Sequence, residues 1–153
     1  MTVKTRLQEL GIELPEPAAP VANYVPFVRS GNLISISGQI PISDGVLAFV
    51  GTVGADVSVE DACAAAKLCA VNLIAQMNAA CDGDLERVVR VVKLGGFVNG
   101  INGFGQQPLV INAASDFMVD VFGDKGRHSR SAVGVNGLPL GVPVEIDALV
   151  EIV

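Results

Sequence analysis

The sequence predicts an α+β domain in which two long helices cover one face of a six-stranded sheet. The chain has 153 residues, enough for one domain; 50% are hydrophobic and only 17% are charged. Six segments have the composition of strands, and two have the apolar spacing of long helices. Because two helices can cover only one sheet face, the other face of so hydrophobic a chain predicts self-association.

The N-terminal segment predicts a short helix followed by an extended arm. Apolar residues recur at helical spacing over 3–10, and Gly11 is suited to end the helix. Residues 13–20 (ELPEPAAP) contain three prolines, which favour an extended backbone.

Strands are expected where β-branched and aromatic residues are bounded by Gly, Asn or Pro. The alternation is clearest at the C-terminus. Even-numbered residues from Val144 to Val150 are apolar, whereas odd-numbered residues from Glu145 to Glu151 are mixed polar and apolar. The apolar side should meet the helices, and the mixed side should form the open face. The predicted strands are residues 24–30, 32–39, 46–53, 87–98, 129–135 and 142–153.

The two long helices are predicted over residues 58–81 and 109–122. Ser58 followed by Asp61 three residues later resembles a capping box at the start of the first helix. In the second helix, Ser115 shares one side with apolar residues.

Charge and cysteine content exclude several classes of function. The net charge of −6 disfavours general nucleic-acid binding, which needs a positive field. The three cysteines form no C-x-x-C pair. His128, the only histidine, lacks a cysteine or carboxylate at ligand spacing and is interpreted as a loop residue. We therefore expect no metal site and reduced cysteines. No apolar run reaches the ~18 residues of a membrane span and no signal peptide is evident, so we expect a soluble cytoplasmic protein.

Arg130 is the first candidate for chemistry. It alternates with Ala132 and Gly134, and if the valines between them face the helices, Arg130 joins Glu145 on the open face. Small neighbours leave room for a ligand, and the planar guanidinium matches a carboxylate. Alternatively, Arg130 pairs with an acidic residue at a subunit contact. Its spacing does not decide between the two roles.

Five other residues have a functional and a structural interpretation. Glu145 is a general base in the functional interpretation. In the structural interpretation it is a solvated strand carboxylate or the salt-bridge partner of Arg130. Asn112 either caps the second helix or reaches a ligand. Tyr24 packs at a strand edge or contacts a ligand. Ser37 and Gly38 end a strand, where Gly38 permits close approach to backbone N–H groups.

Several of these positions belong to short sequence blocks whose order and spacing hold from about Ala22 to the C-terminus. The blocks are Gly31-Asn32-Leu33, Ser37-Gly38-Gln39-Ile40-Pro41, Asn112-Ala113, Arg130-Ser131, Leu138-Pro139 and Val144-Glu145-Ile146-Asp147-Ala148. Considered together, they resemble the Rid family, also called YjgF-like or endoribonuclease L-PSP. Residues 1–21, the helix and arm, look like an addition to a family domain over 22–153.

The resemblance implies a chorismate-mutase-like fold, with a six-stranded mixed sheet, two helices on one face, and a homotrimer with clefts between subunits. It implies hydrolytic deamination of reactive enamine or imine acids, such as 2-iminopropanoate or 2-iminobutanoate, to 2-keto acids and ammonia. No cofactor is implied, and the expected partner is a small carboxylate-bearing metabolite. In the implied site, Arg130 clamps the substrate carboxylate, Glu145 orients water, and the cleft is lined by Tyr24, Ser37, Gly38, Asn112 and Ala132.

One departure from the family pattern supports an alternative function. Many members have Cys where this chain has Ala132. The alternative is a non-catalytic trimer that binds small carboxylates and has a regulatory or partner-binding role. RNA cleavage, the family's older assignment, is disfavoured by the acidic charge and the absence of a histidine pair.

Overall fold

The structure, a computed structural model, describes residues 1–20 and 22–153. Its centre is a five-stranded mixed sheet with strand order β1-β2-β7-β5-β6. Neighbouring strands are antiparallel except for β5 and β6, which run parallel. The strands are β1 (Phe27–Ser30), β2 (Leu33–Gln39), β5 (Val88–Asn99), β6 (Ser129–Val135) and β7 (Val144–Ile152).

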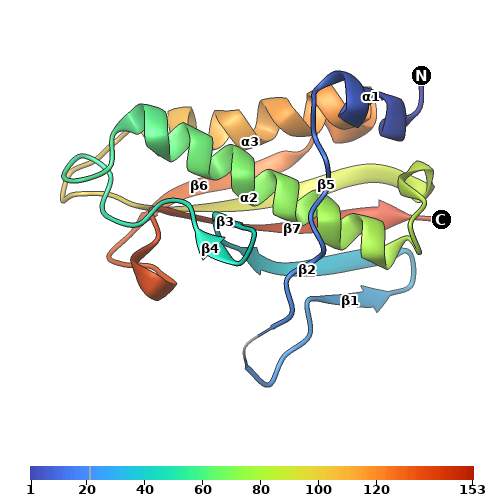
Figure 1. Ribbon diagram of the computed structural model, residues 1–153, viewed down its shortest axis with the longest axis horizontal. Coiled ribbons are helices and arrows are strands. Elements are labelled where there is room, and N and C mark those ends of the chain that lie inside the picture. The colour runs from blue at the N-terminus through green and yellow to red at the C-terminus, as the bar shows by residue number, and fades with distance from the viewer. Residues whose placement is uncertain (21) are drawn as a thin grey trace.

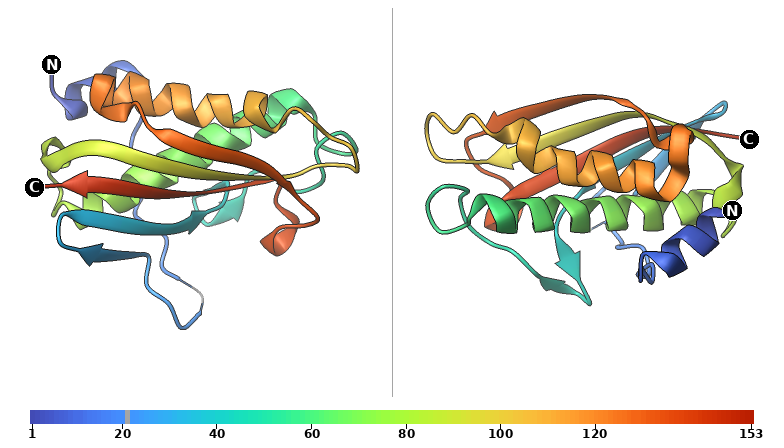
Figure 2. Two further views of the ribbon diagram at one scale, coloured as in Figure 1. Left: turned by 180° about the vertical axis from the view of Figure 1, so that it is seen from behind. Right: turned by 90° about the horizontal axis from the view of Figure 1, so that it is seen from above.

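Two long helices, α2 (Val59–Ala80) and α3 (Gln107–Phe122), pack side by side on one face of the sheet (Figures 1 and 2). The predicted cap is confirmed, because the Ser58 side chain accepts a hydrogen bond from the Asp61 N–H. Much of the buried face of α2 is alanine, and these small side chains let the helix approach the sheet closely. The predicted α+β class, with two helices on one face of a mixed sheet, is confirmed.

The predicted alternation in β7 is also confirmed. Its even-numbered residues from Val144 to Ile152 are buried under the helices, and its odd-numbered residues are half-buried on the opposite face. None of the described helices covers that opposite face, which we call the open face (Figure 2).

The prediction of six strands in the sheet is wrong, because the sheet beneath the helices has five strands. The segment predicted as a strand over 46–53 contributes only two residues, in β4 (Val46–Leu47), which pairs with β3 (Ile42–Ser43) in a separate two-stranded ribbon. Asp44 and Gly45 both have positive φ, as a tight hairpin turn requires. Later in the predicted segment, Gly51 has a φ of 130°, which is outside the range of a regular strand.

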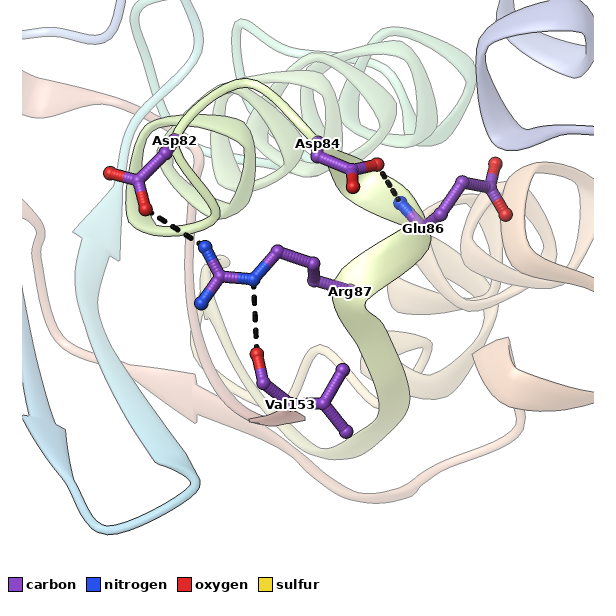
Figure 3. A network of polar contacts seen from close by, with 5 residues as sticks. All are labelled: Asp82, Asp84, Glu86, Arg87 and Val153. Carbon is purple, nitrogen blue, oxygen red and sulfur yellow. Dashed lines mark hydrogen bonds and ion pairs between the residues drawn. The ribbon is translucent and has the colours of Figure 1, made fainter.

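A polar network closes the end of the sheet where β7 finishes (Figure 3). Arg87, in the short 3-10 helix η1 (Leu85–Arg87), donates through Nε to the Val153 carbonyl at 3.0 Å and through Nη1 to Asp82 Oδ2 at 2.8 Å. It thereby joins the turn after α2 to the C-terminus. Two further 3-10 helices, η2 (Gly123–Gly126) and η3 (Pro139–Gly141), precede β6 and β7.

The N-terminal helix α1 (Val3–Glu9) is present as predicted and buries Val3 and Leu7 in the common core. Residues 13–20 have no regular secondary structure and cross over α2 (Figure 1). The predicted division between residues 1–21 and 22–153 falls at residue 21, which lies outside the described residues, and stays a prediction. None of the described helices is long and apolar enough to cross a bilayer.

Candidate functional site

Glu145 lines a cavity of about 340 Å³ at the end of β2, together with the predicted site residues Tyr24, Ser37 and Gly38. We call this cavity the Glu145 cleft. The remaining walls come from the N-terminal arm, the residue before β1, the end of β2, the segment after β2 and the segment before β7. In that order they are Ala18, Ala19, Pro20, Pro26, Gln39, Ile40, Ile42, Pro139 and Leu140.

A β-bulge gives the Glu145 carboxylate its place. The register of β2 against β7 shifts between Ile36 and Gln39, so Ser37 and Gly38 are opposed by a single residue of β7. A Cβ at Gly38 would lie 2.7 Å from Glu145 Oε1. Glycine is therefore required at this position for the carboxylate to lie against the backbone.

The surroundings of Glu145 favour its protonated form. Burial raises its pKa above the ordinary value, and the neighbouring Asp147 carboxylate raises it further. The pKa of Asp147 is raised as well by burial, an effect opposed by the Gly95 N–H and by Lys93. A carboxylate with a raised pKa is a stronger proton acceptor, which suits a general base.

The hydroxyl of Ser37 has a defined direction. Ser37 Oγ donates to the Val25 carbonyl at 2.9 Å, so its free lone pairs can accept from a ligand. Tyr24 is 51% exposed at the rim of the cleft, which leaves its ring accessible to a ligand or a second chain.

Arg130 lies on the helix-covered side of the sheet, which contradicts its predicted place beside Glu145. Its Nη1 donates to Ser115 Oγ at 3.0 Å and its Nη2 to the Pro108 carbonyl at 3.2 Å, both on α3. Gly134 faces α3 too, whereas Val133 is 44% exposed on the open face. The prediction required the valines of β6 to face the helices, and they do not.

His128 lies in the loop between η2 and β6, as predicted, and its imidazole makes two polar contacts. Its Nδ1 lies 2.6 Å from the Gly126 carbonyl and its Nε2 lies 2.9 Å from Ser115 Oγ. In neutral histidine, the carbonyl requires the proton on Nδ1, so Nε2 accepts from the Ser115 hydroxyl. Ser115 then uses a lone pair to accept from Arg130. We call Arg130, Ser115 and His128 the Arg130 cluster.

Sequence reasoning did not include Ser115 or His128 in the site. The available signal was a hydroxyl within the otherwise apolar stripe of the second helix. His128 gave no signal, because its contact with Ser115 depends on how η2 turns the chain from α3 into β6.

Asn112 and Ala132 lie on the same side of the fold as the Arg130 cluster. Asn112 does not cap α3, as one interpretation held, because the helix begins at Gln107. It is exposed, and it lies next to Ser115 on the helix surface because the two are three residues apart. Ala132 is half-buried against the core beneath α3.

The seven predicted site residues therefore form two groups in one chain. Tyr24, Ser37, Gly38 and Glu145 line the Glu145 cleft, whereas Asn112, Arg130 and Ala132 lie on the other side of the sheet. Within residues 1–20 and 22–153, neither Arg130 nor Glu145 belongs to an ion pair. In the same described part of the chain, no three His, Cys, Asp or Glu side chains are placed to hold a metal ion.

Comparison with known proteins decides the family. Residues 4–150 match the family described as "YjgF/chorismate mutase-like, putative endoribonuclease". The chain belongs to the YjgF family. The resemblance predicted from its sequence blocks is confirmed.

Several proteins are similar to this chain over almost their whole length. Protein TCP17 of Trypanosoma cruzi is 50% identical over 151 residues, which are 98% of this chain and 94% of the relative. The crystal structure of Atu1372 from Agrobacterium tumefaciens has a TM-score of 0.93 at 52% identity, covering 99% of this chain and 92% of that one. A "putative endoribonuclease" from Shewanella oneidensis has a TM-score of 0.96 at 36% identity, covering 99% of this chain and 100% of that one.

Proposed function

We propose that this YjgF-family protein hydrolyses small reactive 2-imino acids and their enamine tautomers to 2-keto acids and ammonia, at a cleft completed by a second copy of the chain. One observation carries the proposal. Glu145 lies in a preformed cleft and the Arg130 guanidinium is already oriented, but the two lie on different sides of one sheet. A second copy can bring its own Arg130 to the Glu145 cleft.

The open face supports self-association. It exposes Leu33 (41%) and Val133 (44%) and also carries the half-buried Phe97 and Leu149. Apolar residues gathered on an uncovered sheet face are typical of a subunit contact. Since the cleft and the Arg130 cluster are different patches, their contact is heterologous, and repeating it can close a ring. We propose a homotrimer, in agreement with the family resemblance.

The chemistry requires two charges and one water molecule. Arg130 binds the substrate carboxylate through two N–H donors, which orients the C=N carbon toward Glu145. Glu145 accepts a proton as water adds to that carbon of the protonated imine, giving a neutral carbinolamine. Glu145 returns this proton to the amine nitrogen and accepts the hydroxyl proton as the C–N bond breaks, which forms the 2-keto acid. Ammonia takes that proton from Glu145 and leaves as ammonium. The raised pKa of Glu145 favours the first proton transfer.

The experiment measures keto-acid release from 2-iminopropanoate, generated in place by an amino-acid oxidase acting on L-alanine. The wild-type chain should accelerate release, and Arg130→Ala and Glu145→Gln should each abolish the acceleration. Co-expression of the two variants in equal amounts should restore about a quarter of the wild-type activity, because one site in four receives both intact residues. No recovery in mixed oligomers contradicts the shared cleft, and a wild-type rate equal to buffer contradicts the reaction.

A second candidate is binding of small carboxylates without turnover. The observation that favours it is Ala132, which places a methyl group where many family members have a thiol. Pyruvate binding measured by calorimetry, together with an imine hydrolysis rate equal to that in buffer, supports this candidate.

A further inference from the structure

The N-terminal arm is part of the Glu145 cleft. After α1, residues 13–20 cross over α2 and descend beside the end of β2 (Figure 1). Ala18, Ala19 and Pro20 line the same cavity as Glu145. The arm therefore contributes a wall to the site that the YjgF-like residues of the chain build.

Two amide side chains of α2 hold the apolar walls of the cleft. Asn72 donates through Nδ2 to the carbonyls of Ile40 and Ile42, at 2.9 and 3.0 Å. One helical turn later, Gln76 donates through Nε2 to the Ala18 carbonyl at 3.1 Å. Residues four apart share a helix face, so α2 positions the segment after β2 and the arm with one surface.

The environment of Gln76 indicates that its role is to hold the arm. The side chain is 1% exposed, and its Oε1 has no hydrogen-bond partner among the described residues. A buried amide with an unsatisfied oxygen is costly, and an apolar side chain of similar size would avoid that cost. The hydrogen bond to Ala18 is the one polar contact that this side chain makes within the described residues.

The charge of the cleft limits which ligands fit. No described lysine, arginine or histidine lines it, and its one charged side chain is Glu145. A second carboxylate on a ligand would meet like charge without a compensating cation. An apolar side chain would instead contact the methyl groups of Ala18 and Ala19 and the ring of Pro20.

We infer that the N-terminal arm is a specificity-determining wall, which selects 2-imino acids with an apolar side chain and excludes those with a second carboxylate. This inference rests on the proposed function. Ala19 is the position of choice to test it, because it is exposed, lines the cleft, and makes no hydrogen bond through its side chain.

The experiment compares imino acids generated from L-leucine and L-glutamate. The wild-type chain should favour the leucine-derived imine at least tenfold in kcat/KM. Ala19→Lys places a cation in the wall, so it should raise the glutamate-to-leucine ratio at least tenfold. Ala22→Lys is the matched control, since it adds the same charge to an exposed alanine outside the cleft lining. If the glutamate-to-leucine ratio of kcat/KM is the same in Ala19→Lys and Ala22→Lys, the inference is overturned.

Gln76→Leu tests the attachment of the arm. The thermal unfolding midpoint should stay within a few degrees of the wild type, because the unsatisfied oxygen leaves together with the hydrogen bond. A glutamate-specific protease should cut after Glu13, which is followed by Leu14, several times faster than in the wild type, and kcat/KM for the leucine-derived imine should fall toward that for the alanine-derived imine. An unchanged cleavage rate and an unchanged preference would overturn the role of Gln76.

The binding of stable keto acids separates failure of this inference from failure of the proposed function. If no imine is hydrolysed, the proposed reaction fails, and calorimetry with 4-methyl-2-oxopentanoate and 2-oxoglutarate replaces the assay. The arm is supported as a specificity wall if the wild type binds 4-methyl-2-oxopentanoate more tightly than 2-oxoglutarate, if Ala19→Lys reverses this preference, and if Ala22→Lys keeps it. Equal affinities for the two acids in all three proteins overturn it.

Discussion

The Glu145 cleft and the Arg130 cluster are built in different ways. The cleft belongs to the sheet: a bulge in β2 and the absence of a side chain at Gly38 let the carboxylate lie against the backbone. The Arg130 cluster belongs to the contact between α3 and β6, where Ser115 and the Pro108 carbonyl hold the guanidinium. The bulge in β2 thus positions Glu145, and the surface of α3 positions Arg130.

The two regions also differ in charge. The cleft carries one carboxylate without a cation, and burial beside Asp147 raises its pKa. Among the described residues, Arg130 donates only to neutral oxygens. Each region therefore holds a charge that its own surroundings leave uncompensated, and a carboxylate ligand between two copies would meet the guanidinium of one and the base of the other. Four predictions test this contrast.

Glu145→Gln should have the largest effect. Loss of the general base should lower kcat for 2-iminopropanoate by a factor of at least about 100, with the unfolding midpoint maintained or raised. The measurement is keto-acid release at saturating substrate. Glu151→Gln is the matched control, because Glu151 lies on the same strand and the same face but at the far end. Equal rates in both variants would mean that Glu145 is a surface carboxylate.

Leu33→Asp tests whether the open face joins copies of the chain. A carboxylate on this face should prevent apolar contact between subunits, giving the mass of a single chain by light scattering and at least about a tenfold loss of activity. The control is Val46→Asp, which changes an exposed apolar residue of the β3–β4 ribbon instead. An active oligomer of unchanged mass in Leu33→Asp contradicts the role of the open face.

Ser115→Ala should have an intermediate effect, mainly on KM. Without the hydroxyl, the guanidinium loses the acceptor that orients Nη1, and KM should rise about tenfold, the size expected for one hydrogen bond to a charged group. Ser115→Thr keeps the hydroxyl and should restore most of the affinity. If Ser115→Ala lowers the unfolding midpoint but leaves KM unchanged, Ser115 is structural and does not position Arg130.

The smallest effect concerns pH and stability. Because the pKa of Glu145 is raised by folding, the folded chain binds more protons than the unfolded chain between the ordinary and the raised pKa. The contribution of this group to the free energy of unfolding therefore falls as the pH rises through that range. Denaturant titrations from about pH 4 to pH 7 should show Glu145→Gln gaining stability relative to wild type as the pH rises. A difference independent of pH would contradict the raised pKa.

Much of the fold could be predicted from local patterns. The capping box at Ser58, the turn at Gly31 and the alternation in residues 142–153 each define an element through interactions within a few residues. The same patterns predicted Glu145 on the open face, because its strand neighbours are strongly apolar on the other side. The sequence blocks also carried enough information to indicate the family.

Local sequence patterns could not predict on which side of the sheet Arg130 lies. Both sides of residues 129–135 consist of small or moderately apolar residues, so hydrophobicity does not distinguish them. The parallel register with β5 decides the question, since it pairs Arg130 with the buried Leu94. The contacts of His128 and the tether from Gln76 to the arm likewise join residues 13 and 58 positions apart.

The sequence by itself determined the class of fold, the family and the identity of the charged residues, because these follow from local patterns and from blocks in fixed order. Only the tertiary structure decided that Glu145 and Arg130 lie on different sides of the sheet and that the N-terminal arm lines the cleft. The physical reason is that burial, strand register and packing across α2 act between distant segments, and no local pattern carries that information.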